Sequence, residues 1–285
     1  MSFDNAYEAI TEENDSRWAF GTGFEDPLSG VDTTVPSGVD GDRLAAYCLM
    51  LGDDALIFSH RLQEWCTNAP ELEDEVAIAN IALDLLGQAR LLLARAGKAD
   101  GSERSEDSYA FFRSEQEYRN VRLAELEGGH FGHLIARLLV FSIWRLALLQ
   151  RLQSSVDPVL AAIADKGVKE VAYHRDYAAQ WAVRLGDGTE LSHARMQEGL
   201  DAVWPYVDEL FAAHEVEFVE SPSLRPEFDA ILDQVLAAAT LKRPEAGALA
   251  GVSGRMGRDG VHTERMGYLL ATLQSVAREH PDATW

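Results

Sequence analysis

Cysteine is nearly absent from this sequence, and its distribution excludes an internal crosslink. The chain of 285 residues contains two cysteines, Cys48 and Cys66. Both fall in one predicted helix, 18 residues apart. At the helical rise this separation is about 27 Å, which is too far for a disulfide within one copy of the chain. Free thiols of this kind indicate a reducing compartment.

Targeting and membrane-spanning patterns are also missing. The first residues, MSFDNAYEAITEEND, are acidic and lack the charged-then-apolar pattern of a secretory signal. No stretch approaches the roughly 18 uninterrupted apolar residues of a membrane span. We therefore expect a cytoplasmic protein without a membrane partner.

Lysine is scarce, and the charge is strongly one-sided. The formal net charge is −22, which argues against nucleic acid or an anionic membrane as a partner. Most of the cations are arginines, because lysine occurs only at Lys98, Lys166, Lys169 and Lys242. An acidic surface with few lysines predicts a salt-adapted cytoplasm, in which counterions screen the self-repulsion.

Strand patterns are almost absent, whereas helical patterns cover most of the chain. Across residues 43–97, apolar side chains recur at spacings of three and four, for example at Tyr47, Leu51 and Phe58. This period is typical of amphipathic helices. Pro70 interrupts the run, and proline suits the first turn of a new helix. The stretch predicts two long antiparallel helices joined by a short turn, in an all-α helical bundle.

The composition divides the chain into two parts. Residues 1–41 are rich in Gly, Asp, Ser and Thr without a sustained period, and we expect an acidic arm that is mobile or draped over the domain. Residues 42–285 are expected to form one helical domain. After the first hairpin, its helices are predicted at residues 110–125, 130–154, 157–185, 192–213, 227–241 and 262–279.

Two acids lie among the apolar positions of the predicted hairpin. Asp54 and Asp84 are each 15 residues from Ala69, so they should meet at a similar height. A charge buried without a partner is costly. Two interpretations remain open: partial exposure at the edge of the apolar stripes, or a polar centre of the kind that holds carboxylate-bridged metals in helix bundles.

A two-iron centre needs a ligand set that this sequence only partly contains. One Glu comes from each of two helices, and Glu-x-x-His comes from each of the other two. The second helix has Asp84 but Gly87 at the histidine position, and the fourth has Glu170 with His174 four residues later. Glycine offers no side-chain ligand, whereas a pair spaced by four still shares one helix face.

The third helix lacks an acid where the ligand set requires one. The turn before the fourth helix centres near Asp157, so residues 140–144, around Ser142, should face Glu170 and His174. No carboxylate occurs from residue 134 to 153. We therefore expect no intact two-iron site and assign no catalytic residue and no metal ligand.

Two other patterns have both a functional and a structural interpretation. His130 and His133 could bind a metal at the surface, although solvated polar side chains explain them more simply. The glycine-rich residues 251–260 include Arg255 and Arg258 and could hold an anion through backbone amides, or they could be a flexible surface connection. No strand precedes them and no Lys-Ser/Thr follows, so they are not a nucleotide P-loop.

Three segments, in this order, resemble a known family. They are LGDDALIFSHRLQEWCTNAPELEDEVAIANIALDLLGQAR, KEVAYHRDYAAQWAVRLGDGT and GRDGVHTERMGYLLATLQ. They are similar to the C-type subunits of the phenylacetyl-CoA 1,2-epoxidases, which act in phenylacetate degradation. The resemblance covers about residues 43–285 and leaves the arm at residues 1–41 outside.

The resemblance implies a ferritin-like helical bundle, here with additional C-terminal helices. It implies a structural subunit that pairs with a related catalytic subunit of the A type, which carries the two irons and the substrate site. A small B-type subunit, together with an iron–sulfur/flavin reductase, completes the complex. This chain would then hold no cofactor. The remnants of the metal site, paired with each other or with arginines, would be Asp54, Asp84, Gly87, Ser142, Glu170 and His174.

Two rival functions stay open at this stage. The first is an active oxygenase or oxidase subunit with an unusual metal site built on Asp54, Asp84, Glu170 and His174. The second is a ferritin-like binding protein that acts alone. Under the family resemblance, ring epoxidation belongs to the complex rather than to this chain.

Overall fold

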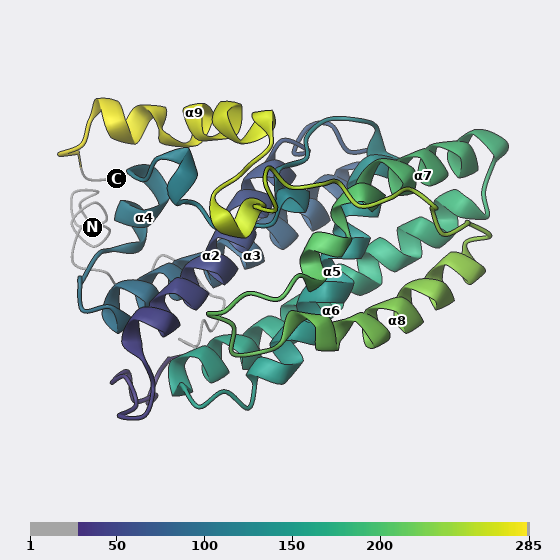
Figure 1. Ribbon diagram of the computed structural model, residues 1–285. Coiled ribbons are helices and arrows are strands. Elements are labelled where there is room, and N and C mark those ends of the chain that lie inside the picture. The colour runs from purple at the N-terminus through teal and green to yellow at the C-terminus, as the bar shows by residue number, and fades with distance from the viewer. Residues whose placement is uncertain (1–27, 284–285) are drawn as a thin grey trace, which may run out of the picture.

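The computed structural model describes residues 28–283, and this part of the chain is built almost entirely from helices (Figure 1). Among these residues, β-type pairing is limited to one isolated bridge between Val252 and Arg255, which confirms the all-α prediction. The α-helices are α2 (Gly41–Gln63), α3 (Leu72–Ala99), α4 (Glu106–Phe111), α5 (Phe131–Leu152), α6 (Pro158–Gly186), α7 (Glu190–Val203), α8 (Arg225–Ala238) and α9 (Glu264–Glu279).

Four long helices form the central bundle. α2 and α3 make one hairpin, α5 and α6 make a second, and α3 also packs against α6. A single long connection, residues 100–130, joins the two hairpins, and we call it the crossover. Two hairpins joined by one crossover are typical of ferritin-like bundles. Phe58 of α2 meets Phe141 of α5 with ring centres 4.5 Å apart, so the two hairpins share one apolar interior.

Side-chain caps determine where two of these helices begin. Asp40 accepts a hydrogen bond from the Arg43 backbone N–H at 3.1 Å before α2, and Asp157 accepts one from Leu160 at 2.8 Å before α6. Each cap satisfies an N–H group that has no partner within its helix. Asp157 is fully buried and also pairs with Arg95 of α3, so the turn of the second hairpin is anchored on the first.

α5 is the core helix of the domain, whereas α3 lies half at the surface. Both are long and apolar enough to cross a membrane by length and composition, but 94% of the apolar window of α5 is buried inside the protein, against 44% for α3. α3 consequently presents apolar side chains to solvent, namely Leu72, Val76 and Leu83.

Three further helices cover the bundle, and additional helices in the C-terminal part of the chain were predicted from the sequence. α7 and α8 both pack against α5 and α6. α9 lies along an edge of the molecule beside α4 (Figure 1). Each is held by fully buried apolar side chains, including Met196 of α7, Phe228 of α8 and Met266 of α9.

The crossover differs from the helix predicted at residues 110–125. It contains the short α4 and two 3₁₀ turns, with extended stretches between them. The acid pair on α2 explains this conformation. The backbone N–H of Arg119 donates to Asp53 Oδ2 at 2.8 Å, and that of Val121 donates to Asp54 Oδ1 at 2.8 Å. A backbone N–H that donates to one of these carboxylates cannot also donate to the carbonyl four residues earlier, as an α-helix requires.

Two boundary predictions are also wrong. Cys66 lies beyond the end of α2 rather than inside it. α7 begins after Thr189, whose Oγ1 accepts a hydrogen bond from the Ser192 N–H at 3.1 Å, and it ends at Val203. A capping threonine three residues earlier than Ser192 therefore sets the start of this helix.

The predicted N-terminal arm is only partly described. Residues 1–27 lie outside the described residues. Within the remainder, the Thr33 carbonyl accepts a hydrogen bond from Arg95 Nη1 at 2.6 Å. Since Arg95 also pairs with Asp157, one buried arginine fastens this segment and the second hairpin to α3.

Candidate functional site

An arginine occupies the centre of the four-helix bundle. Arg145 projects from α5 and is 1% exposed. Its Nε donates to Gln88 Oε1 of α3 at 2.9 Å, and its Nη1 donates to the Leu51 carbonyl of α2 at 3.4 Å. Burial lowers the pKa of Arg145 to about 10, and the negative charges of Asp54 and Glu170 oppose part of this fall. Arg145 is therefore still charged at neutral pH.

Gln88 connects this arginine to the acid on α6. Its Nε2 donates to Glu170 Oε2 at 2.8 Å, while its Oε1 accepts from Arg145. The other oxygen of Glu170 lies 3.0 Å from Lys166 Nζ. A side-chain amide both accepts and donates, so it fits between a cation and a carboxylate. The result is a hydrogen-bonded chain that runs from α5 through α3 to α6.

Asp54 is fully buried and bound by an arginine from the segment before α9. Arg258 Nη2 lies 2.8 Å from Asp54 Oδ2, and Nη1 lies 2.9 Å from Oδ1. This two-point contact is the strong form of an Arg–carboxylate pair. Burial works against the charge of Arg258, but the Asp54 carboxylate holds the pKa of Arg258 above its usual value. Both oxygens of Asp54 are thus occupied by protein donors.

The remaining predicted positions make contacts that do not involve Asp54. His174 Nε2 is 2.9 Å from Asp84 Oδ2, and this pair links α6 to α3 where Asp84 is 35% exposed. Gly87 has open space where a Cβ would project. Ser142 is buried, and its Oγ donates to the Leu139 carbonyl of its own helix at 3.2 Å.

The side chains at the bundle centre do not fit a two-iron centre. Asp54 is held by Arg258, Glu170 is held by Gln88 and Lys166, and the third helix contributes a cation where the ligand set requires an acid. Among residues 28–283, the groups of three or more His, Cys, Asp or Glu side chains that are close enough to share an ion do not include the bundle centre. The Arg145 charge would also repel a metal cation placed beside it.

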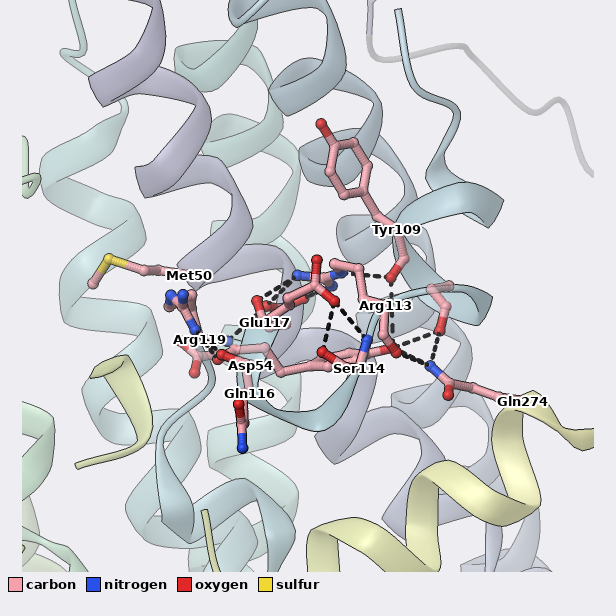
Figure 2. Close-up of polar contacts among 12 residues, drawn as sticks. Met50, Asp54, Tyr109, Arg113, Ser114, Gln116, Glu117, Arg119 and Gln274 are labelled. Atoms are coloured by element: carbon pink, nitrogen blue, oxygen red, sulfur yellow. Dashed lines mark hydrogen bonds and ion pairs between the residues drawn. The ribbon is translucent and has the colours of Figure 1, made fainter. Parts of the chain in front are cut away.

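The crossover is fixed to α2 and to α9 by a second polar cluster. Arg113 Nη1 donates to Asp53 Oδ2 of α2 at 3.0 Å. Figure 2 shows the neighbouring contacts, in which the Ser114 N–H donates to Glu117 Oε2 at 2.7 Å and Gln274 Nε2 of α9 donates to the Arg113 carbonyl at 3.1 Å. The acid pair Asp53 and Asp54 therefore organises both the crossover and the C-terminal segment.

Part of the glycine-rich stretch packs tightly against this crossover. The Gly257 N–H donates to Glu209 Oε1 at 3.0 Å, and Arg122 Nε donates to Glu209 Oε2 at 2.7 Å. A Cβ on Gly257 would collide with the Asn120 carbonyl, so glycine is required here for the close approach. This part of residues 251–260 is not a flexible surface connection.

The two arginines considered for anion binding have different surroundings. Arg258 lies inside the protein and is committed to Asp54. Arg255 is exposed, and its Nη2 donates to the Asp259 carbonyl at 2.7 Å. The pair therefore does not converge on one anion.

Comparison with known proteins places the chain in a family. A family model described as phenylacetic acid catabolic protein matches residues 32–285. The chain belongs to this family. It is also 41% identical over 252 residues to the C subunit of the 1,2-phenylacetyl-CoA epoxidase of Escherichia coli (strain K12), covering 86% of this chain and 100% of the relative. The resemblance stated from sequence motifs is confirmed.

The family match begins earlier than the motifs indicated. It starts at residue 32 and so includes the end of the 1–41 segment that the motif comparison left outside. This agrees with the hydrogen bonds that Arg95 donates to the Thr33 and Thr34 carbonyls. In this family member, the segment just before α2 is part of the packed domain.

Sequence reasoning missed the two side chains that define the bundle centre. A two-iron ligand set consists of acids and histidines, so an arginine such as Arg145 is not among the residues that it predicts. A signal was present, because Arg145 lies within a helix whose neighbours are almost all apolar. A charge in such a position needs a buried partner, and Gln88 occupies a core position of α3.

Proposed function

We propose that this chain is the structural, non-catalytic subunit of a multicomponent phenylacetyl-CoA epoxidase of phenylacetate catabolism. Its Escherichia coli relative is named as the C subunit of that enzyme, and the match covers the whole relative. Under this proposal a homologous catalytic subunit of the A type holds the di-iron centre and performs the ring epoxidation. This chain supports that catalytic protein and holds no cofactor of its own.

The observation that carries the proposal is the Arg145 guanidinium at the bundle centre. It is charged, fully enclosed and hydrogen-bonded to Gln88 of α3. This positive charge offsets the negative charges of Glu170 and Asp54, a role that metal ions have in a two-iron centre. The two carboxylates also have protein partners of their own. The helices keep the ferritin-like arrangement because internal ion pairs and hydrogen bonds hold them.

The exposed apolar side of α3 supports a role as a partner subunit. Leu72, Val76 and Leu83 lie on one stripe of this helix and are exposed, and Tyr173 is exposed on α6. The Asp84–His174 contact holds α3 and α6 together in this region. Obligate interfaces commonly exceed about 2,000 Å² and are apolar at their centre, so this α3–α6 face is our candidate contact with the catalytic subunit.

The rival functions have less support. An active oxygenase with an unusual metal site needs Asp54, Asp84, Glu170 and His174 to converge, but Asp84 and His174 form a separate pair. A stand-alone binding protein does not account for the exposed apolar side of α3. The family implies two further partners, the small B-type subunit and a reductase. Under this proposal the complex works in the cytoplasm. Neither nucleic acid nor a membrane is a partner.

Metal content tests the proposal directly. The chain is expressed alone and together with the catalytic subunit, and iron is measured by elemental analysis. We expect no stoichiometric iron in the chain alone and about two irons per heterodimer with the partner. Stoichiometric iron in the chain alone, lost on Glu170→Ala and His174→Ala, would make this subunit the enzyme and overturn the proposal.

A matched pair of surface variants tests the contact face. Leu83 of α3 is 59% exposed and Leu191 of α7 is 61% exposed, so aspartate at either position should leave folding nearly unchanged. We expect Leu83→Asp to abolish copurification with the catalytic subunit, whereas Leu191→Asp should retain it. Retention by both variants would exclude the α3–α6 face while leaving the metal experiment intact.

A further inference from the structure

The start of α5 makes an unusually close contact with α7. A Cβ on Gly199 of α7 would lie 2.5 Å from the Gly132 carbonyl of α5, and a Cβ on Gly132 would lie 2.8 Å from the Arg195 carbonyl. Both glycines are therefore needed for the two backbones to approach. Their chain neighbours, His133 and Glu198, are brought together by this contact.

Three metal-ligand side chains meet at this α5–α7 junction. His130, His133 and Glu198 each offer one ligand atom, and these atoms lie within 4.8 Å of one another. His130 Nε2 is 3.3 Å from Glu198 Oε2, and the two imidazole rings have centres 4.2 Å apart. Ligand atoms on a tetrahedral zinc ion are separated by about 3.3 Å, so small side-chain movements suffice to enclose an ion.

The two imidazoles are not fully committed to other partners. The two side chains form a capping box at the start of α5, but its contacts are weak, and the buried His130 Nδ1 makes no hydrogen bond of ordinary geometry among the described residues. His133 Nδ1 accepts only a long hydrogen bond, 3.4 Å, from the His130 backbone N–H. Structural histidines usually have both ring nitrogens satisfied. These rings can therefore exchange weak contacts for a metal bond.

We propose that His130, His133 and Glu198 form a binding site for a single borderline divalent ion, with Zn²⁺ as the best fit, at the α5–α7 junction. Imidazole nitrogens suit Zn²⁺, Cu²⁺ and Ni²⁺ more than Mg²⁺ or Ca²⁺, and one carboxylate completes a common three-residue zinc set. Solvent fills the remaining coordination position. The ion fastens the turn before α5 to α7.

Two charges near the site act on a bound ion in opposite directions. The partial positive charge at the N-terminal end of α5 opposes a cation. The Glu198 carboxylate offsets it, because its Oε2 lies 3.3 Å from His130 Nε2.

The site is separate from the bundle centre and independent of the proposed function. It uses His133 of α5, His130 just before that helix and Glu198 of α7, and their hydrogen bonds and ion pairs do not include Arg145 or Asp54. A chain that binds zinc here can still be a non-catalytic subunit. Failure of this inference and failure of the proposed function are therefore distinguishable.

Zinc binding to the full chain, prepared without a histidine tag, tests the inference. Equilibrium dialysis with Zn²⁺ followed by elemental analysis should give one ion per chain. We expect His130→Ala and His133→Ala to lose binding and Glu198→Gln, at a residue 65% exposed, to raise Kd at least about tenfold. His280→Ala, at an exposed histidine on the end of α9, is the matched control and should bind as the native chain does.

A second measurement keeps the test decisive if a histidine variant folds poorly. Co²⁺ bound at the site should give the intense visible bands of a tetrahedral nitrogen–oxygen environment, and Glu198→Gln should shift them. The inference is overturned if Glu198→Gln and His130→Ala both bind Zn²⁺ with native affinity and stoichiometry, or if Co²⁺ shows only the weak spectrum of the hydrated ion.

Discussion

The bundle centre and the α5–α7 junction hold similar side chains in very different electrostatic settings. At the centre, Asp54 and Glu170 are enclosed together with Arg258, Arg145 and Gln88. At the junction, His130, His133 and Glu198 lie near the surface, and Glu198 is mostly solvent-exposed. The first region contains its own cations, whereas the second contains ligands that are only loosely bonded.

The difference shows how burial determines what a polar cluster can do. An enclosed carboxylate needs a counter-charge within the protein whenever the chain is folded, and at the centre Arg258 and Lys166 supply it for Asp54 and Glu170. A partly exposed cluster is solvated, so it can remain without a partner until an ion binds. Metal binding in this fold is therefore expected outside the position that ferritin-like enzymes use.

The largest predicted effect comes from removing a cation at the bundle centre. Arg258→Ala leaves Asp54 buried without its partner, and such a change costs about 3–5 kcal/mol of unfolding free energy. The measurement is urea denaturation of the full chain. Arg255→Ala, at an exposed arginine three residues earlier, is the control and should change stability by less than about 0.5 kcal/mol. If both variants lost the same unfolding free energy, the Arg258–Asp54 ion pair would contribute no more to stability than an exposed arginine does.

Zinc should stabilise the junction and leave the centre unaffected. At free Zn²⁺ about 100 times Kd, binding to the folded state alone adds about 2.7 kcal/mol, which raises Tm by several degrees. Thermal unfolding with and without Zn²⁺ measures this gain. We expect it to disappear in His133→Ala and to persist in Arg145→Leu. A gain that persists in His133→Ala would place the ion elsewhere.

Removing the central guanidinium should cost less than removing Arg258. Arg145→Leu takes away one buried charge but leaves Gln88 Oε1 without its donor, which costs about 1–3 kcal/mol. Asp54 retains Arg258. Denaturant unfolding gives the cost, and Arg151→Leu, at a partly exposed arginine on the same helix, is the control. We expect no iron binding by Arg145→Leu, and stoichiometric iron would mean that the guanidinium alone excludes the metal.

The smallest effect concerns thiol reactivity in the bundle. Cys48 is fully buried on α2, and burial raises the pKa of its thiol, whereas Cys66 is partly exposed. Reaction with a thiol reagent requires the thiolate and access to it. We expect one fast-reacting thiol in the native chain, none in Cys66→Ser, and two after unfolding. Two fast thiols in the native chain would show that the interior around α2 opens readily.

The long helices could be predicted from the sequence because their signals are local. Apolar spacing and Pro70 predicted α2 and α3, and Asp157 with Pro158 predicted the start of α6. The crossover was mispredicted for a non-local reason. Its backbone amides bind Asp53 and Asp54, which are more than 60 residues earlier in the chain. The apolar pattern within residues 110–125 contains no information about these hydrogen bonds to α2.

The same division applies to the candidate sites. The sequence by itself predicts that the two-iron ligand set is incomplete, because Gly87 cannot supply a side-chain ligand and no acid occurs in α5. It also determined the family, through motifs spread over the chain. Only the tertiary structure decided that Arg145 occupies the bundle centre and that Arg258 is the partner of Asp54.

The tertiary structure also decided that His130 and His133 have a third neighbour. Glu198 lies on another helix, and the close contact of Gly132 with Gly199 brings it within reach. Spacing along the chain reports which side chains share a helix face. It cannot report which helices touch, because that depends on the packing of apolar surfaces from distant segments. For this reason the positions of the helices could be predicted from the sequence, whereas the partners of their charged side chains were decided by the tertiary structure.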